Sequence, residues 1–282
     1  MRAPAERAVG AHVAPDPGVD RSQDGQDLAG EDPGAAFVRH PRAPHPPLGA
    51  DTLERLRQIS TPTLCTQLFK LGFRNMYLHG VRPLCPDKRM AGEAVTVRFA
   101  PAREDRAGYE VLADPGYPQR HAIEHIERGQ VLVMDCRGVA SAANAGDILV
   151  SRLQVRGAAG LVLDGGIRDY PSVQQFGFPV YALGPAAPAH VVRHVAVDEN
   201  VPIGCAEVLV VPGDVMVGDG EGVVCIPRAV ADTVAAHGLE QEELEAFLLE
   251  KVRDGAPLPG TYPPNEQTLA EYEKWKRRRG TI

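Results

Sequence analysis

The 282-residue chain lacks the features that mark several large classes of protein. Its five cysteines are scattered and never spaced as Cys-x-x-Cys, so neither a disulfide framework nor a cysteine zinc site is expected. No apolar run approaches the roughly 20 residues that span a bilayer, and no apolar signal-peptide core opens the chain. The formal net charge of -7 leaves no basic footprint for nucleic acid. We therefore expect a soluble cytoplasmic protein that binds neither a membrane nor nucleic acid.

Motifs for several kinds of chemistry are also missing. The chain has no Gly-x-Ser-x-Gly elbow, no Walker loop and no Gly-x-Gly-x-x-Gly fingerprint. It has only five lysines, and none follows a buried strand, where a desolvated Schiff-base amine would be expected. Nucleotide binding and covalent imine chemistry are therefore disfavoured.

Two histidine pairs have a spacing that suits zinc. The segment His121–His125 matches the His-x-x-Glu-His pattern of inverted zinc proteases, although a zinc site also needs a third ligand further along the chain. A zinc hydrolase stays open as an alternative to a surface helix whose apolar side is Ala122 and Ile126. The pair His190 and His194 carries Val where a zincin needs Glu, which favours a loop or a short helix.

Alternating helical and extended patterns predict an α/β domain with a mixed sheet and helices on both sides. Alternation predicts a strand at 90–99, and short apolar segments predict strands at 131–135, 161–163, 179–183, 208–211, 215–217 and 223–226. Helices are predicted at 53–59, 61–71, 121–128, 147–156 and 173–176, then from about 228 with a second segment at 240–252, and near 272–275. No repeat and no second core is visible. The predicted domain spans residues 49–260.

Both ends of the chain differ from this domain in composition. Residues 1–48 are rich in Ala, Pro, Gly and Asp and nearly free of aromatic residues, which predicts a disordered extension or a loosely packed arm. Residues 261–282 form a polar tail.

The stretch from Gly146 to Asp169 gathers polar groups at one edge of the predicted sheet. A helix starts after Gly146 and ends at Gly157, and a buried strand then leads through Asp-Gly-Gly to Arg168 and Asp169. In open α/β sheets, ligands bind at the carboxyl ends of strands. The helix start offers backbone N–H groups that suit an anion. An anion site, a fork-shaped cation and a carboxylate are therefore expected to lie together.

Asp147, twenty intervening residues and then Arg168-Asp169 resemble the signature of the RraA-like proteins. Supporting matches are Met90–Thr96, Arg128–Asp135, Gly146–Leu149 and Pro212–Val224, and the resemblance covers about residues 55–258. That family includes metal-dependent 4-hydroxy-4-methyl-2-oxoglutarate/4-carboxy-4-hydroxy-2-oxoadipate aldolases and the ribonuclease E activity regulator. The resemblance implies an α/β sandwich like the swivelling phosphohistidine domain. It also implies a homo-oligomer, a trimer or a dimer of trimers, with the active site at a subunit interface.

The resemblance also implies a role for individual residues. Asp169 would hold a divalent metal, Mg²⁺ or Mn²⁺, partly through water, as suits an all-oxygen site with few protein ligands. Arg168 would hold the keto and carboxylate oxygens of the substrate, and Asp147 would order a metal-bound water. The substrate-binding residues would be Gly146, Asp147, Ile148, Leu149 and Arg168. A glutamate from a neighbouring subunit, Glu242 or Glu245, would complete the site.

These roles predict a class II pyruvate aldolase, a metal-dependent carbon–carbon lyase. It would cleave a 4-hydroxy-2-oxo acid to pyruvate and a second carbonyl product, with oxaloacetate decarboxylation as a side activity. The alternative is a non-catalytic regulator that binds ribonuclease E. The groups on C4 of the substrate are left open, and a deoxy-oxo sugar acid is among the possibilities.

Overall fold

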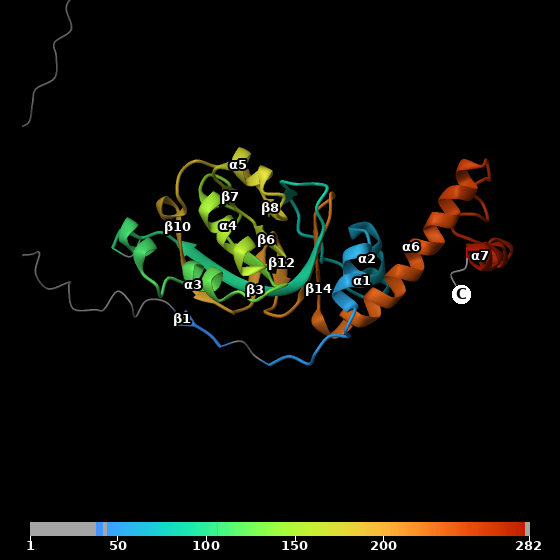
Figure 1. Ribbon diagram of the computed structural model, residues 1–282, viewed down its shortest axis with the longest axis horizontal. Helices are drawn as coiled ribbons and strands as arrows, with labels where there is room; N and C mark the ends of the chain where they lie inside the picture. Colours follow the sequence, from blue (N-terminus) through green and yellow to red (C-terminus); the bar gives the residue numbers. More distant parts are fainter. Residues whose placement is uncertain (1–37, 42–43, 106, 280–282) are drawn as a thin grey trace, which may run out of the picture.

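The computed structural model describes residues 38–41, 44–105 and 107–279, and a curled mixed sheet forms its centre (Figure 1). Among these residues, nine strands join in the order β1-β10-β3-β4-β6-β8-β2, with β13 and β14 attached through β3. Their bounds are β1 (Val38–Arg39), β2 (Arg82–Pro83), β3 (Met90–Pro101), β4 (Val131–Asp135), β6 (Gly160–Leu163), β8 (Val180–Ala182), β10 (His194–Glu199), β13 (Val215–Gly218) and β14 (Val223–Ile226). The predicted α/β class with a mixed sheet is confirmed.

Strand β3 bends the sheet because it has two antiparallel partners along one edge. Its first four residues pair with β13, and its last five pair with β10, while β4 runs parallel along the opposite edge. β3 arcs through the whole sheet in Figure 1. A 12-residue strand with two successive partners cannot stay flat, since each pairing follows its own twist.

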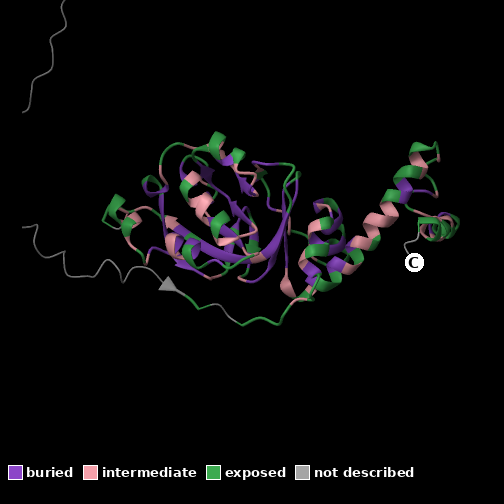
Figure 2. Ribbon diagram, in the orientation of Figure 1, coloured by how far each residue is buried: buried purple, intermediate pink, exposed green. Residues whose placement is uncertain are grey.

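Two cores lie on opposite faces of the sheet, as the alternation along β4 requires. Leu132 and Met134 point to the face covered by α3 (Pro118–His125), α4 (Asp147–Arg156) and α5 (Tyr170–Gln175). Val131 and Val133 point to the other face, where the β11–β12 hairpin (Ile203–Cys205 and Val208–Val210) packs. Figure 2 shows the buried residues concentrated in these strands.

A third core joins the sheet to the C-terminal half of the chain. It lies between β13, β14 and three helices, α1 (Thr52–Gln58), α2 (Thr61–Lys70) and α6 (Ala231–Arg253). Ser60 caps the start of α2: its side chain accepts a hydrogen bond from the N–H of Thr63 at 3.4 Å, and Pro62 occupies the first turn.

Predicted helix bounds are wrong in two places. α3 begins at Pro118 and ends at His125, so the segment through Arg128 is not helical. Between β3 and α3 a 3₁₀ turn covers Tyr109–Ala113. The two predicted C-terminal segments form the single 23-residue helix α6.

Helix α6 continues through Gly238 because that glycine lies against α1. A Cβ placed on Gly238 would come within 2.6 Å of Cδ1 of Ile59, a side chain that is 1% exposed. The glycine therefore marks close helix packing rather than a helix end. Beyond this contact α6 extends away from the sheet, and α7 (Glu266–Arg279) lies at its far end (Figure 1).

The ends of the chain are described only in part. Residues 1–37, for which a disordered extension was predicted, lie outside the described residues. Val38–Arg39 form β1 beside β10, and the side chain of Arg228 donates to the carbonyl of Pro46 at 2.7 and 2.9 Å. None of the described helices is both long and apolar enough to cross a bilayer.

The packing at Gly238 gives a testable prediction about stability. Gly→Ala in a helix interior ordinarily stabilises a protein, but here we expect Gly238→Ala to lower the free energy of unfolding by about 1 kcal/mol, because overpacking outweighs the gain in helix propensity. Urea unfolding measures this. The double variant Gly238→Ala/Ile59→Val removes the clashing Cδ1, so its loss should be smaller than the sum of the single losses. Additive losses would contradict the contact.

Candidate functional site

Two short parallel strands bring the predicted site residues together. β5 (Ala143–Ala145) pairs with β7 (Gly166–Ile167), and β7 pairs in turn with β9 (Gly184–Pro185). Ala145 lies opposite Ile167, so the residues that follow them, Gly146 and Arg168, leave the sheet at the same edge. The N–H of Arg168 donates to the carbonyl of Ala145 at 3.0 Å. The chain leaves this edge along α4 and returns to it through β6 and β7. This path accounts for the 21-residue spacing between Asp147 and Arg168.

Gly146 allows this edge to be crowded. A Cβ at Gly146 would lie 2.6 Å from Oδ2 of Asp169 and 2.7 Å from Cγ of Arg168. Its backbone is extended, with φ of -144°, so the need for glycine is steric rather than conformational. The close approach of strand and side chains is possible only without a side chain at this position.

Arg168 and Asp169 present their charged groups at this edge. Nε of Arg168 lies 3.4 Å from Oδ2 of Asp169, and the two side chains are 51% and 36% exposed. Asp169 has φ of 55°, in the left-handed region that aspartate tolerates better than most residues. Strained backbone of this kind concentrates at functional sites.

The start of α4 carries the third charged group. The carboxylate of Asp147 accepts a hydrogen bond from the N–H of Ile148 at 2.7 Å, and the N–H of Asp147 lies 3.5 Å from Oδ2 of Asp169. Two of the predicted anion-binding N–H groups therefore face carboxylates of the chain itself. A bound substrate carboxylate would have to replace the Asp147 carboxylate at the N–H of Ile148.

Asp164 stabilises the turn that leads to Arg168. Its carboxylate accepts hydrogen bonds from the N–H groups of Cys136, Gly138 and Ala206 at 2.5, 3.1 and 3.1 Å. Burial nevertheless raises the pKa of Asp164 to about 6. The carboxylate connects three loops immediately before Gly165 and β7, so it fixes the direction in which β7 leaves the sheet.

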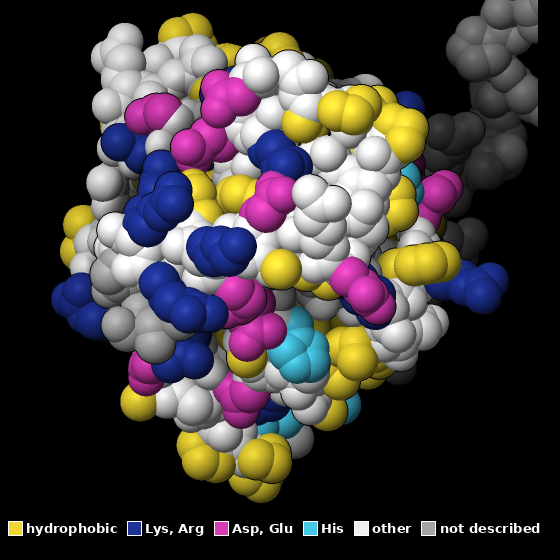
Figure 3. Space-filling view, turned by 90° about the vertical axis from the view of Figure 1, so that its right-hand side faces the viewer, with side chains coloured by type: hydrophobic (Ala, Val, Ile, Leu, Met, Phe, Trp, Pro, Cys, Tyr) yellow, Lys and Arg dark blue, Asp and Glu magenta, His cyan; other side chains and the backbone are white. Residues whose placement is uncertain are grey.

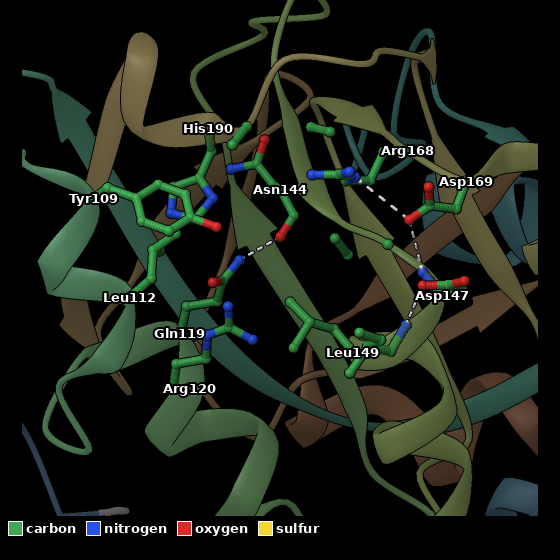
Figure 4. Close-up of a pocket in the computed structure, with 15 residues that line it drawn as sticks. Tyr109, Leu112, Gln119, Arg120, Asn144, Asp147, Leu149, Arg168, Asp169 and His190 are labelled. Atoms are coloured by element: carbon green, nitrogen blue, oxygen red, sulfur yellow. Dashed lines mark hydrogen bonds and ion pairs between the residues drawn. The ribbon is translucent and has the colours of Figure 1, made fainter.

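The residues that follow β5 and β7 line one side of a cavity of about 380 Å³ (Figure 4). The residues on this side are Gly146, Asp147, Ile148, Leu149, Arg168 and Asp169. The structure thus brings together every site residue predicted within one chain. The opposite side was not predicted, and its labelled residues are Tyr109, Leu112, Gln119, Arg120, Asn144 and His190.

A buried network lies behind the unpredicted side. The hydroxyl of Tyr117 accepts the N–H of Ala196 at 2.9 Å and lies 2.7 Å from Nε2 of His190, to which it donates. Burial, with smaller contributions from His194 and Arg120, lowers the pKa of His190 to about 3. His190 is therefore neutral. It lies in a short 3₁₀ turn, as predicted, whereas His194 begins β10.

Neither histidine pair has the surroundings of a zinc site. Nε2 of His194 lies 2.9 Å from the Asn144 amide nitrogen, and burial lowers the pKa of His194 to about 4. Nδ1 of His121 lies 2.6 Å from Glu199, and its ring stacks on that of His125. Over the described ranges, no group of three or more His, Cys, Asp or Glu side chains is arranged to hold a metal ion.

The donor set at the site edge nevertheless suits one kind of metal. Asp169 and Asp147 offer carboxylate oxygens beside solvent, since Asp169 is 36% exposed and Asp147 is half-buried. Mg²⁺ commonly binds through one or two carboxylates and keeps several waters. The residues present therefore fit a magnesium-like ion, and they fit zinc poorly because no histidine or cysteine lines this side of the cavity.

The predicted neighbouring-subunit glutamates lie far from this cavity in the same chain. Both are on α6, at the end of the molecule that faces the viewer in Figure 3. Glu242 accepts the N–H of Ser60 at 2.8 Å; burial raises its pKa, but the hydrogen bonds from Ser60 and Thr63 outweigh burial and lower it. Glu245 accepts a hydrogen bond from Nε2 of Gln241 at 2.8 Å and lines an apolar hollow with Leu249.

Known proteins are similar to this chain over its central part. The sequence model of the RraA-like family, described as Aldolase/RraA, matches residues 61–225. A Halalkalibacterium halodurans protein, provisionally named a 4-hydroxy-4-methyl-2-oxoglutarate aldolase, is 30% identical over 184 residues, which cover 65% of this chain and 80% of that protein.

Two solved structures are similar in both fold and sequence. Streptomyces coelicolor RraAS2, described as an unusual member of the RNase ES inhibitor RraA protein family, has a TM-score of 0.64 and 32% identity over 72% of this chain and 98% of its own. An uncharacterized protein from Pseudomonas syringae pv. tomato str. DC3000 has a TM-score of 0.67 and 25% identity over 77% of this chain and 100% of its own. The chain therefore belongs to the RraA-like family.

Proposed function

We propose that the chain is a divalent-metal-dependent lyase that cleaves a 4-hydroxy-2-oxo acid to pyruvate and a second carbonyl product. The observation that carries this proposal is the pairing of β5 with β7, which places one guanidinium and two carboxylates at the mouth of a cavity of about 380 Å³. The name of the Halalkalibacterium halodurans relative supports the same chemistry.

Arg168 is the residue that would bind the 2-oxo acid. Its planar guanidinium can donate two parallel hydrogen bonds, one to the keto oxygen and one to the carboxylate. The N-terminus of α4 carries partial positive charge. The N–H of Ile148 would bind the other oxygen of that same carboxylate. Asp147 would turn away from that N–H as the substrate binds.

Asp169 would hold Mg²⁺ or Mn²⁺, with Asp147 contributing through water. When bound, the ion supplies an electrophile that polarises the 2-oxo group. Asp169 is suited to this role because its left-handed backbone holds the carboxylate at the cavity edge, beside the N–H of Asp147.

Arg168 also has a role in the bond-breaking step. When the C3–C4 bond breaks, its electrons pass into the 2-oxo acid and form the enolate of pyruvate, whose negative charge the guanidinium stabilises. A base must remove the proton of the C4 hydroxyl, and Asp147 acting through water is the candidate on this chain; the proton would then return to C3 of the enolate and give pyruvate. Loss of CO₂ from oxaloacetate gives the same enolate, so oxaloacetate decarboxylation is the proposed side activity.

We further propose that the working form is a homo-oligomer, a trimer or a dimer of trimers, in which α6 reaches a neighbouring site. Glu245 is then the better candidate for the neighbouring glutamate, because Glu242 is hydrogen-bonded to the start of α2 in its own chain.

A regulator that binds ribonuclease E is the second candidate function, favoured by the similarity to RraAS2. The two are distinguished by assaying pyruvate release from 4-hydroxy-2-oxo acids and, separately, pull-down of ribonuclease E. Nanomolar binding to ribonuclease E without lyase activity on any 2-oxo acid would favour the regulator.

Chelation and substitution test the proposed chemistry. We expect EDTA to abolish pyruvate release and Mg²⁺ or Mn²⁺ to restore it. Asp169→Ala should lower kcat/KM by about 100-fold or more, and Arg168→Lys by about 10- to 100-fold because the donor fork is lost. Arg152→Gln, which removes an exposed arginine bound to Glu124, is the matched control. Equal rates with and without EDTA would contradict metal dependence.

Gly146→Ala tests the crowding at the site edge. Its new Cβ would displace the side chains of Asp169 and Arg168, so we expect a loss in kcat/KM of about 10-fold or more, because misplaced catalytic groups are costly. Both displaced groups are flexible and partly exposed, so the midpoint of thermal unfolding should change little. Unchanged kinetics would show that the contact does not position these groups.

A further inference from the structure

The far side of the cavity contains a buried amide with an unused acceptor. Gln119, on α3, is 0% exposed. Its Nε2 donates to the backbone carbonyl of Asn144, which can only accept, so the orientation of the amide is fixed. Oε1 of Gln119 is buried and has no hydrogen-bond partner among the described residues. A buried acceptor without a donor is costly, so this oxygen suits a ligand hydroxyl.

The next residue, Arg120, supplies a cation on the same side. Its Nε is buried and makes no hydrogen bond within the described part of the chain. No acidic side chain in that part forms an ion pair with it, whereas Arg152 on α4 is paired with Glu124. A half-buried guanidinium in this position is suited to a carboxylate, which can accept from two of its N–H groups.

The surrounding groups leave this chemistry to Gln119 and Arg120. His190 is neutral, and its Nε2 is engaged by the hydroxyl of Tyr117. Among the described lining residues, the charged groups are Arg120 on this side and Asp147, Arg168 and Asp169 on the other. Figure 4 shows Gln119 and Arg120 across the cavity from Arg168.

We infer that Gln119 and Arg120 form a specificity subsite that binds a second carboxylate of the substrate and a hydroxyl next to it. The cavity has a guanidinium on each side, so it fits a molecule with an anionic group at each end. This inference rests on the proposed function, since Arg168 would bind the 2-oxo acid end. It selects dicarboxylic 4-hydroxy-2-oxo acids over those with a neutral, sugar-like end.

The subsite is tested by comparing two substrates that differ at the far end. With 4-hydroxy-2-oxoglutarate, Arg120→Met should lower kcat/KM by about 10- to 100-fold, while with 4-hydroxy-2-oxopentanoate it should stay within about threefold. Arg120→Lys keeps the charge and should recover part of the loss. Arg152→Gln removes a charge near the same helix outside the cavity and should leave the ratio unchanged.

Equal losses on both substrates, or no loss on the dicarboxylate, would overturn the subsite. Calorimetric binding of 2-oxoglutarate and 2-oxobutanoate to the full chain separates this inference from the proposed function. If the wild type cleaves neither hydroxy acid, the lyase proposal fails, yet tighter binding of 2-oxoglutarate that Arg120→Met removes would still support the subsite. If 2-oxoglutarate binds no more tightly than 2-oxobutanoate, the subsite is wrong.

Discussion

The pairing of β5 with β7 is the constraint on which the candidate site depends. Because the two strands are parallel and Ala145 lies opposite Ile167, α4 starts at the same edge at which Arg168 and Asp169 follow β7. This edge is crowded, and only a residue without a side chain fits at Gly146. The carboxylate of Asp164 holds the preceding turn through three backbone N–H groups. The rest of the sheet supports this arrangement, since β6 and the face that α4 covers fix the distance between the two strand ends.

The two sides of the cavity differ in how they are built, and this difference suits their proposed roles. The side with Asp147, Arg168 and Asp169 lies at strand and helix ends, is partly exposed, and has carboxylates that can meet an ion or water. The opposite side is formed by α3 and is backed by the buried Tyr117–His190 network. Because the groups of this network are buried and neutral, Arg120 is the charged side chain that faces the cavity on this side. Reaction chemistry would thus take place on the open side and substrate selection on the buried side.

The sequence predicted the parts of this structure that depend on local pattern. α4 has the predicted bounds because Gly157 adopts a left-handed conformation, with φ of 79°, and ends the helix there. β4 also matches its apolar run. β5 was missed, because Ala143–Ala145 is short and carries no strand pattern, and with it the reason for the 21-residue spacing. The chain from 228 to 252 was predicted as two segments, and the contact of Gly238 with Ile59, which explains the single helix α6, is tertiary. Gln119 and Arg120 were missed for the same reason: only the fold turns this face of α3 toward Arg168.

Binding of oxalate, a planar dianion with the shape of the pyruvate enolate, tests most directly whether Arg168 and Asp169 form a metal-assisted 2-oxo acid site. Calorimetry on the full chain should show oxalate binding in the presence of Mg²⁺ or Mn²⁺. Binding should weaken by about 100-fold or more when the ion is removed, when Asp169 is changed to Ala, or when Arg168 is changed to Met. The Arg152→Gln variant should bind as the wild type does. Oxalate affinity that is the same with and without the ion, and in both site variants, would contradict the assignment of these two residues.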